Sequence, residues 1–409
     1  NLVMNSLHST TGFKVLSSIF IIVLLSLGVV ACSGTTSEEE ALDDFSTDAT
    51  FFTGQSGDEE YTGEAKPVVA GETRGFETAS VMRNKRGSHG AVLLQDGRVF
   101  VVGGQGSGSQ RGIIYTSAEV FDPVSGVWET AGDMKDHRHD LCVALLPDGR
   151  VLVAGGRGNL NMAIPTSEIY DADAETWVST GELVTERDYM PCTSLNDGRV
   201  LITGGEGRDY QDLSSAEVYD PEKGEWEAVP DMSVTRARHT ATLLDDGRVL
   251  ITGGGKLDPP YEKSAEIFDP NTNTWTVVAE MSTGRADHQA VLLDDGRVLA
   301  VGGRGKKLTS EIYDPETNIW EKTGNTVQPH AEGAIIRLST GKILLTGGIG
   351  YGLRAAALYD TSTGVWEELE EMNNDRYRHE MIRLESDLIL IIGGQGREGV
   401  TAQVESFTP

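Results

Sequence analysis

The stretch from Asp246 to Trp275 contains one copy of the unit that decides the fold. It opens with Asp246-Gly247, continues through Val249-Leu-Ile-Thr-Gly-Gly254, and ends with Ser264-Ala-Glu-Ile-Phe-Asp-Pro270 before Trp275. An Asp-Gly pair between two apolar runs is a strong hairpin signal, which would place both central residues of the turn at positive φ. The unit therefore predicts two strands joined by a tight turn, then a third strand, and a fourth that begins near the tryptophan.

The same unit recurs along the chain. A Gly-Gly pair begins seven times, at Gly103, Gly155, Gly204, Gly253, Gly302, Gly347 and Gly393. In the six complete copies an aromatic residue precedes a tryptophan by seven positions, as Phe268 precedes Trp275. Seven repeats of four antiparallel strands predict an all-β fold, a seven-bladed β-propeller.

An apolar strand that ends in Gly-Gly, followed by an aromatic-Asp-Pro sequence and a tryptophan, resembles the kelch repeat, and the resemblance covers Phe76 to Pro409. If the first strand of each unit runs from one face to the other, the 4–1 and 2–3 connections share a face, which we call the top face. The hairpin turns share the bottom face. The resemblance implies that a ligand binds at the top face.

The ring is expected to close through its N-terminal end, because the seventh unit stops at Pro409 without a fourth strand. Gly75-Phe-Glu-Thr-Ala79 copies Val127-Trp-Glu-Thr-Ala131, with Phe76 in place of the tryptophan. A strand around Phe76 would then complete the last blade and remove open sheet edges.

The N-terminal residues predict export and anchoring. The apolar run from Val15 to Val30 is shorter than the roughly 20 residues of a membrane-spanning helix and is typical of a secretory signal. Val29-Val-Ala-Cys32 resembles the lipobox of bacterial lipoproteins, which implies lipid attachment at Cys32 and a place on the outer membrane or cell surface; an ordinary signal peptide is the alternative. We therefore assign residues 1–31 to a signal peptide, 32–66 to an acidic disordered tether and 67–409 to the propeller.

The net charge narrows the possible partners. A net charge of −29 excludes nucleic acid bound through its phosphates.

Cys142 and Cys192 fall in neighbouring units, one residue out of phase. Because successive side chains alternate between the faces of a strand, we expect these two cysteines to stay unpaired.

The 2–3 loops at the top face carry ten bases against six acids, together with several tyrosines, an exception in this acidic chain. Such loops suit a glycan or a peptide, although scattered surface charge is an equal alternative. The candidate ligand-binding residues are Arg157, Arg208, Tyr210, Tyr261, Arg304, Lys306, Lys307, Tyr351, Arg354 and Arg397.

A second set of residues recurs just before the first strand of the units. Six units have an arginine there and a glutamate in the third strand; the sixth unit has His330 and Ala357 instead. Because arginine and glutamate are lost together, we predict a ring of half-buried ion pairs, preferred over an anion-binding ring. The arginines are Arg86, Arg138, Arg187, Arg236, Arg285 and Arg376, and the glutamates are Glu119, Glu168, Glu217, Glu266, Glu311 and Glu405.

His330 and Glu332 are the only candidates for acid–base chemistry, because the sixth unit departs from the pattern of the others; simple drift of that repeat is the alternative.

Two functions follow. The preferred one is a membrane-anchored, extracytoplasmic and monomeric module that binds a protein or glycan, possibly acidic, through its top-face loops. The alternative is a carbohydrate-active enzyme, because kelch-like propellers include sugar mutarotases and galactose-oxidase-like enzymes. We expect no cofactor and no metal site, because no zinc-type spacing or other metal motif stands out.

Overall fold

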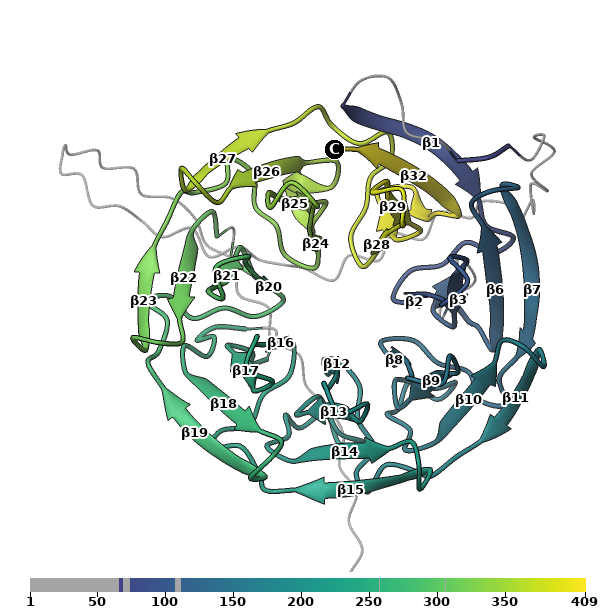
Figure 1. Cartoon of the computed structure of the whole chain (residues 1–409), viewed down its shortest axis with the longest axis horizontal. Coiled ribbons are helices and arrows are strands. Elements are labelled where there is room, and N and C mark those ends of the chain that lie inside the picture. The colour runs from purple at the N-terminus through teal and green to yellow at the C-terminus, as the bar shows by residue number, and fades with distance from the viewer. Residues whose placement is uncertain (1–65, 69–73, 107–111, 257, 306) are drawn as a thin grey trace, which may run out of the picture. The chain divides into compact units, whose positions relative to one another are not determined.

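The computed structural model describes residues 66–68, 74–106, 112–256, 258–305 and 307–409, and for Tyr351 the backbone only. These residues form seven four-stranded antiparallel sheets around a central axis (Figure 1). The predicted seven-bladed, all-β propeller is therefore confirmed. Within the described ranges no helix is long and apolar enough to span a membrane.

The blades are numbered by their order along the chain, and the strands of each blade are given in order from the axis to the outer rim. Blades 1 to 4 are formed by β2 (Gly90–Leu93), β3 (Val99–Val102), β6 (Ser117–Asp122) and β7 (Val127–Asp133); β8 (Cys142–Leu145), β9 (Val151–Ala154), β10 (Ser167–Asp171) and β11 (Thr176–Ser179); β12 (Cys192–Ser194), β13 (Val200–Thr203), β14 (Ala216–Asp220) and β15 (Glu225–Val229); and β16 (Thr240–Leu243), β17 (Val249–Thr252), β18 (Ala265–Asp269) and β19 (Thr274–Val278). Blades 5 to 7 are formed by β20 (Gln289–Leu292), β21 (Val298–Val301), β22 (Ser310–Asp314) and β23 (Ile319–Lys322); β24 (Ala334–Arg337), β25 (Ile343–Thr346), β26 (Ala356–Asp360) and β27 (Val365–Glu368); and β28 (Glu380–Arg383), β29 (Ile389–Ile392), β32 (Gln403–Thr408) and β1 (Gly75–Val81).

Shorter elements extend the 2–3 loops of three blades. Two-stranded ribbons rise from blades 1 and 7, and a single 3₁₀ turn lies in blade 6: β4 (Gln105–Gly106) with β5 (Ile113–Ile114), β30 (Gln395–Gly396) with β31 (Gly399–Val400), and η1 (Gly350–Gly352).

The second strand of every blade is the centre of its core. All four residues of β17, for example, are buried, because the neighbouring blades cover both faces of the sheet. A strand that is buried on both faces reads as a continuous apolar run rather than an alternating one. The Gly-Gly pair after it has a packing reason: Gly253 has a φ of +65°, and a Cβ there would lie 2.4 Å from the carbonyl oxygen of Arg285 in the next blade.

The ring closes as predicted. β1 pairs antiparallel with β32, and Phe76 lies opposite Phe407 with ring centroids 4.9 Å apart. The aromatic pairs of the other blades have the same arrangement; the centroids of Phe268 and Trp275 are also 4.9 Å apart. The outer strand of blade 7 thus comes from the opposite end of the propeller sequence (Figure 1).

The Asp-Gly turns differ from the expected geometry. In the turn of blade 4 Gly247 has a φ of +85°, whereas Asp246 is not among the residues with positive φ. Asp246 instead accepts hydrogen bonds from the backbone N–H and the Nε–H of Arg248, at 3.0 and 2.8 Å. The aspartate is therefore used for its side-chain acceptor rather than for a left-handed backbone.

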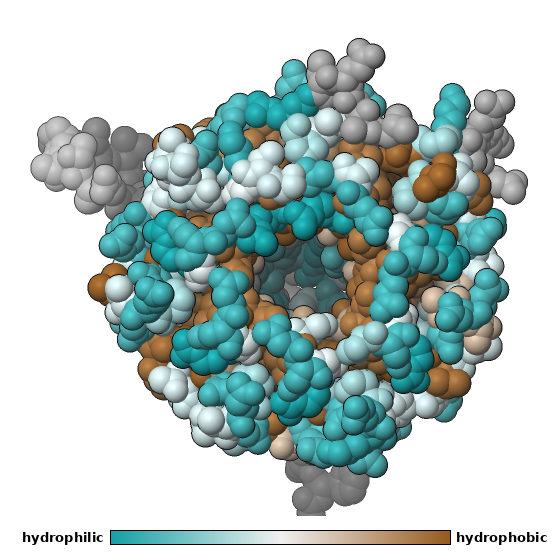
Figure 2. Space-filling model, viewed as in Figure 1, coloured by the Kyte–Doolittle hydropathy of each residue, from teal (hydrophilic) through white to brown (hydrophobic). Residues whose placement is uncertain are grey.

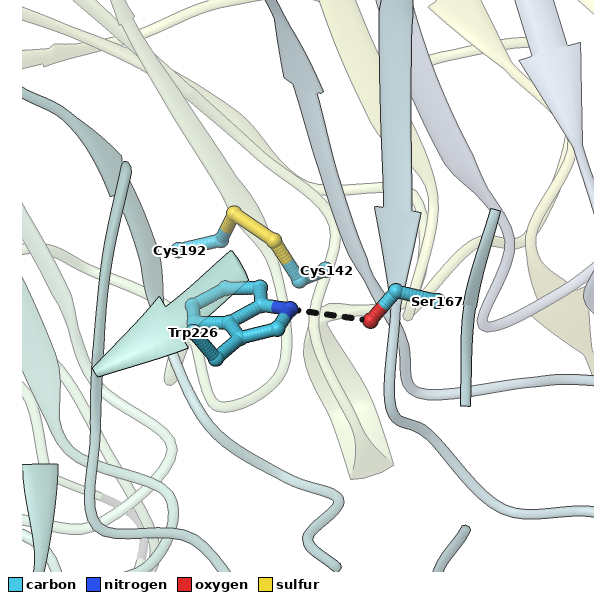
Figure 3. Close-up of a disulfide and its surroundings, with 4 residues drawn as sticks. All are labelled: Cys142, Ser167, Cys192 and Trp226. Atoms are coloured by element: carbon cyan, nitrogen blue, oxygen red, sulfur yellow. Dashed lines mark hydrogen bonds between the residues drawn. A yellow bond between two sulfur atoms is a disulfide. The ribbon is translucent and has the colours of Figure 1, made fainter. Parts of the chain in front are cut away.

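The prediction that Cys142 and Cys192 stay unpaired is wrong. They form a disulfide between blades 2 and 3, with Cα atoms 5.2 Å apart, next to Trp226, whose indole N–H donates to Ser167 (Figure 3). Equivalent strands of neighbouring blades pack face to face. A side chain of blade 2 that points toward blade 3 therefore meets side chains on the opposite face of the equivalent strand. Successive residues of a strand alternate between its two faces, so an offset of one residue places the two cysteines opposite each other.

The chain reaches the propeller at the bottom face. The backbone N–H of Val68 donates to the carbonyl of Pro123, at 2.9 Å, in the turn between β6 and β7, and the Val68 side chain packs on the core between blades 7 and 1. The predicted signal peptide, Cys32 and the tether up to residue 65 lie outside the described residues.

Candidate functional site

The ring of arginines lies inside the propeller wall. Each of the six guanidinium groups is fully buried and binds the glutamate of its own blade; Arg236, for instance, lies 3.1 Å from Glu266. Arg236 also donates to the carbonyl oxygens of Gly253 and Ser264, at 2.8 and 3.0 Å. The pairs are therefore fully rather than half buried, and these arginines join the first, second and third strands of a blade instead of facing a ligand.

The glutamates of this ring also accept hydrogen bonds from the 4–1 connection that leads into their own blade. Glu405 accepts hydrogen bonds from the backbone N–H groups of Asn373 and Asn374, at 2.8 and 3.0 Å, besides its ion pair with Arg376. These charged and hydrogen-bonded partners hold the pKa of Glu405 below its usual value although burial acts in the opposite direction.

Blade 6 replaces this ion pair with a smaller contact. His330 is buried, and its Nδ1 lies 2.5 Å from the carbonyl oxygen of Gly347, the equivalent of the glycine carbonyl that the arginine binds in other blades. Burial lowers the pKa of His330 to about 4, so its ring is neutral near pH 7. The structure thus gives His330 a packing position, away from a shared acid–base site with Glu332.

The histidines that follow the ring arginines by three residues join neighbouring blades. Nε2 of His239 and of His379 each lies 2.8 Å from a threonine hydroxyl of the preceding blade, Thr203 and Thr346. His89 packs on blade 7, where the equivalent residue is Ile392, and both of its ring nitrogens lack a hydrogen-bond partner. Burial lowers the pKa of His89 to about 3.

The residue two positions after each ring residue has an unusual backbone. All seven have a positive φ between 48° and 56°, although none of them is glycine. We call them the mouth residues: Ser88, Asp140, Tyr189, Arg238, Asp287, Glu332 and Arg378. For tyrosine, arginine and glutamate this left-handed conformation is uncommon and costs about 1–3 kcal/mol. Their side chains are thus held at these positions against the preference of the backbone.

Backbone hydrogen bonds link the mouth residues into a belt. The N–H of a mouth residue donates to the carbonyl of the mouth residue in the preceding blade; Arg378 donates to Glu332 at 2.8 Å, and Ser88 donates across the closing seam to Arg378 at 3.1 Å. Six joints of the ring have this bond. Figure 2 shows a hollow at the centre of the ring, with hydrophilic residues deep inside it and both hydrophilic and hydrophobic residues around it.

The side chains of the mouth residues converge on the axis. The guanidinium of Arg378, in blade 7, lies 5.5 Å from the ring centroid of Tyr189, in blade 3, although the two blades are not neighbours. Arg238 lies 4.0 Å over the same ring and Arg157 lies 5.2 Å from it. One tyrosine therefore contacts three arginines from different blades, an arrangement stabilised by cation–π attraction.

Carboxylates complete this network. Arg157 binds Asp188 and, at 2.6 Å, Glu206; Glu206 also accepts two bonds of 3.2 Å from Arg238. On the other side of the ring Glu332 binds both Arg304 and Arg378, and Arg304 also binds Asp287. Asp140 accepts a 2.7 Å bond from His139. We call these nine charged residues the mouth network: Asp140, Arg157, Asp188, Glu206, Arg238, Asp287, Arg304, Glu332 and Arg378.

Burial and charge act differently on the acids of this network. Burial raises the pKa of Asp188 to about 6 despite its ion pair with Arg157, and burial together with the nearby charge of Glu332 raises the pKa of Asp287 to about 6. The pKa of Asp140 is lowered to about 2, because Arg378 and His139 outweigh its burial. The mouth thus holds two carboxyl groups that change charge near neutral pH.

The predicted basic top-face surface is reduced in the structure. Arg157 and Arg304 turn inward into the mouth network, and Arg208 and Arg397 lie 3.8 and 3.6 Å from Glu186 and Asp375, acids of the 4–1 connections. Arg354 lies 3.5 Å from Glu371. Counting acids in the 2–3 loops alone missed these partners, because the 4–1 connections lie beside those loops only in the folded ring.

The remaining top-face candidates lie around the rim. Tyr210 is half exposed, donates to the carbonyl of Asn161 at 3.0 Å, and packs 5.2 Å from Arg157. The ammonium of Lys307 lies 4.8 Å over the ring of Tyr261. Lys306 and the side chain of Tyr351 lie outside the described residues.

Sequence reasoning missed most of the mouth network. Of its nine members only Arg157, Arg304 and Glu332 were among the candidates. A signal was present: the ring residue is arginine in six blades, whereas the mouth residue two positions later differs in charge or size between most blades. A position that varies among otherwise similar repeats, at a point shared by all blades, is expected of a recognition surface.

The bottom face offers a different kind of depression. An open volume of about 630 Å³ lies between blades 2 and 3, lined by hairpin-turn residues that include Arg150 and Arg199. Each of these arginines lies 2.7 Å from the aspartate of its own turn, Asp148 and Asp197. These groups support the local turn geometry, so the mouth is the better candidate site.

The described residues contain no group of three or more His, Cys, Asp and Glu side chains arranged to hold a metal ion.

The fold and the mouth define a seven-bladed β-propeller with a polar axial site. Three segments of the chain, residues 86–135, 189–233 and 236–282, match the family model of the Kelch motif. The propeller thus contains Kelch motifs in these three segments. No curated protein matches the sequence.

Two solved structures illustrate the similarity in fold. One is a fungal alcohol oxidase in complex with copper, with a TM-score of 0.65, 15% identity, and coverage of 82% of this chain and 76% of the other. The second is a protein called YjhT, with a TM-score of 0.52, 15% identity, and coverage of 79% of this chain and 95% of the other. At this level of identity the likeness concerns the fold.

Proposed function

We propose that the protein is a binding module that takes a protein or glycan ligand at its top face, centred on the mouth. The observation that carries this proposal is the left-handed backbone shared by all seven mouth residues. Glycine would adopt this backbone without a steric penalty, yet each blade has a side chain there, and most of these side chains differ. Retained side chains at an unfavourable backbone position indicate a role in recognition rather than in folding.

Binding is favoured over acid–base catalysis by the state of the two catalytic candidates. His330 is buried against a backbone carbonyl, and Glu332 is shared by Arg304 and Arg378. Neither group is available to transfer a proton to a ligand in this arrangement. A mutarotase- or oxidase-like activity that is lost in His330→Ala would overturn the proposal.

We further propose that the module works outside the cytoplasm, anchored to the envelope through Cys32. The disulfide between Cys142 and Cys192 supports an oxidising compartment, where such bonds persist.

The test is a screen of glycans and envelope proteins against the full chain, with hydrogen exchange of the top-face segments as the readout. We expect a true ligand to protect the segments around Tyr189 and Arg378, and Tyr189→Asn and Arg378→Asn to weaken its binding by at least about tenfold. Asparagine tolerates the left-handed backbone, so these variants remove the side chain and keep the belt. Arg248→Asn, at the bottom face, is the matched control. Protection confined to the bottom or outer strands would contradict the proposal.

A further inference from the structure

The mouth network contains two similar bridges on opposite sides of the axis. In the first, Arg157 binds both Asp188 and Glu206; in the second, Arg304 binds both Asp287 and Glu332. Each bridge also contacts a second arginine: Arg238 lies 3.2 Å from Glu206, and Arg378 binds Glu332. All four arginines of the network are therefore held by the protein's own carboxylates.

The charges of the network do not balance. Its four arginines face five carboxylates, which leaves one net negative charge when every acid is ionised. The packing is also incomplete, because Oδ1 of Asp188 and Nε of Arg238 are buried without a hydrogen-bond partner. The Nε atoms of Arg138, Arg236 and Arg285 in the structural ring are unpaired as well, so the charge imbalance and the shared bridges are what set the network apart. The network thus has the features of a site held closed by its own acids.

One acid in each bridge is placed to lose its charge first. Asp188 is fully buried and faces Arg157, together with the acids Asp140 and Glu206. Its pKa of about 6 lies well above that of an exposed aspartate, which is near 3.8.

Asp287 has equivalent surroundings on the opposite side of the axis. It faces Arg304, Arg238, Glu332 and Tyr261, and its pKa is also about 6. In each bridge the second carboxylate, Glu206 or Glu332, is shared with another arginine.

We propose that mild acid opens the mouth as an anion-binding site, because neutral Asp188 and Asp287 leave Arg157 and Arg304 with one carboxylate partner each. Four arginines then face three carboxylates, and the net charge of the network changes from one negative to one positive. The ligand group that fits is an oxyanion, such as a carboxylate or a sulfate. This regulation rests on the proposed function of the mouth as the ligand site.

Inorganic sulfate is the probe for the test, because it stays doubly charged at both pH values and any pH dependence must come from the protein. We expect calorimetry on the full chain to give sulfate binding at about pH 5 that is at least about tenfold tighter than at about pH 7.5, at constant ionic strength. Arg378→Asn should abolish the acid-induced binding.

The decisive variant is Asp188→Asn combined with Asp287→Asn, which mimics the neutral acids at any pH. It should bind sulfate at about pH 7.5 as tightly as the unmodified protein does at about pH 5. Asparagine suits the left-handed backbone at position 287. Asp246→Asn in a bottom-face turn is the control, and its sulfate binding should match that of the unmodified protein at both pH values.

Two results would overturn the inference: sulfate binding that is equal at both pH values, or a folded double variant that binds no sulfate at about pH 7.5. A melting curve establishes that the double variant is folded. These outcomes are separate from the fate of the proposed function. If the screen finds no ligand at the mouth but sulfate binds as described, the proposed function fails and the acid response stands. If a ligand binds at the mouth but sulfate binds equally at both pH values, the proposed function stands and the acid response fails.

Discussion

Cys142 in β8 and Cys192 in β12 are joined in a disulfide although they occupy positions one residue out of step in their blades. Cys142 lies opposite Ala154 in its sheet, and Cys192 lies opposite Ile202, the residue before the equivalent of Ala154. This one-residue offset is what allows the two cysteines to meet. Adjacent blades face each other with opposite faces of their sheets, and a shift of one residue moves a side chain from one face to the other.

Replacing both cysteines, as Cys142→Ala with Cys192→Ala, should lower the free energy of unfolding by about 2–4 kcal/mol, because the crosslink restricts the unfolded chain. Thermal unfolding of the two forms in non-reducing buffer measures the difference. With reductant the unmodified protein should approach the double variant, whose own curve should not move. Thiol labelling of the native, unreduced protein at both positions would contradict the disulfide.

Breaking one ion pair of the ring should cost more than removing both partners. Arg236→His alone leaves the carboxylate of Glu266 buried without its arginine, and Glu266→Ala alone leaves Arg236 buried without its carboxylate; we expect each to cost about 3–5 kcal/mol. The double variant reproduces the His330 and Ala357 arrangement of blade 6, so it should be clearly more stable than the sum of the single changes implies. Denaturant unfolding of the three variants measures the coupling, and strictly additive losses would refute it.

The pH dependence of stability should have opposite signs at Glu405 and Asp188. The pKa of Glu405 is lowered in the folded state, so its ionised form stabilises the protein above its ordinary pKa near 4.5, and that contribution is lost as the pH falls. Glu405→Gln should therefore reduce the melting temperature strongly at about pH 8 and less at about pH 4.

Asp188 has a raised pKa of about 6, so its ionisation costs stability above that pH and nothing below about 3.8. The free energy of unfolding of Asp188→Asn, measured relative to that of the unmodified protein, should therefore rise by about 2–3 kcal/mol as the pH is raised from about 4 to about 8. Parallel pH dependences of the two variants would show that one of these assignments is wrong.

Deleting residues 70–81 should yield insoluble protein. The deletion removes β1 and exposes the edge of β32, whose backbone groups can then pair with another molecule. Phe76→Ala keeps the strand and its hydrogen bonds, so this variant should remain soluble with a lower melting temperature. Size-exclusion chromatography and melting curves test both, and a monomeric deletion that melts normally would exclude the role of β1 in closure.

Much of the fold could be predicted because each blade repeats local signals. The Asp-Gly turns, the apolar run before Gly-Gly and the seven-residue spacing from Phe268 to Trp275 act within one unit. Co-occurrence of Arg236 with Glu266, and the loss of both in blade 6, was enough to pair them. The mouth network could not be found in this way, because Arg378 and Tyr189 lie far apart in the sequence and meet only when blade 7 closes on blade 1.

The sequence by itself determined the number of blades, the strands in each and the closing strand, because these depend on side-chain patterns within a repeat and on one copied segment. Only the tertiary structure decided which acids face which arginines at the axis and that Cys142 meets Cys192. These contacts join different blades, and their partners are set by the curvature of the ring and by the face that each sheet turns to its neighbour.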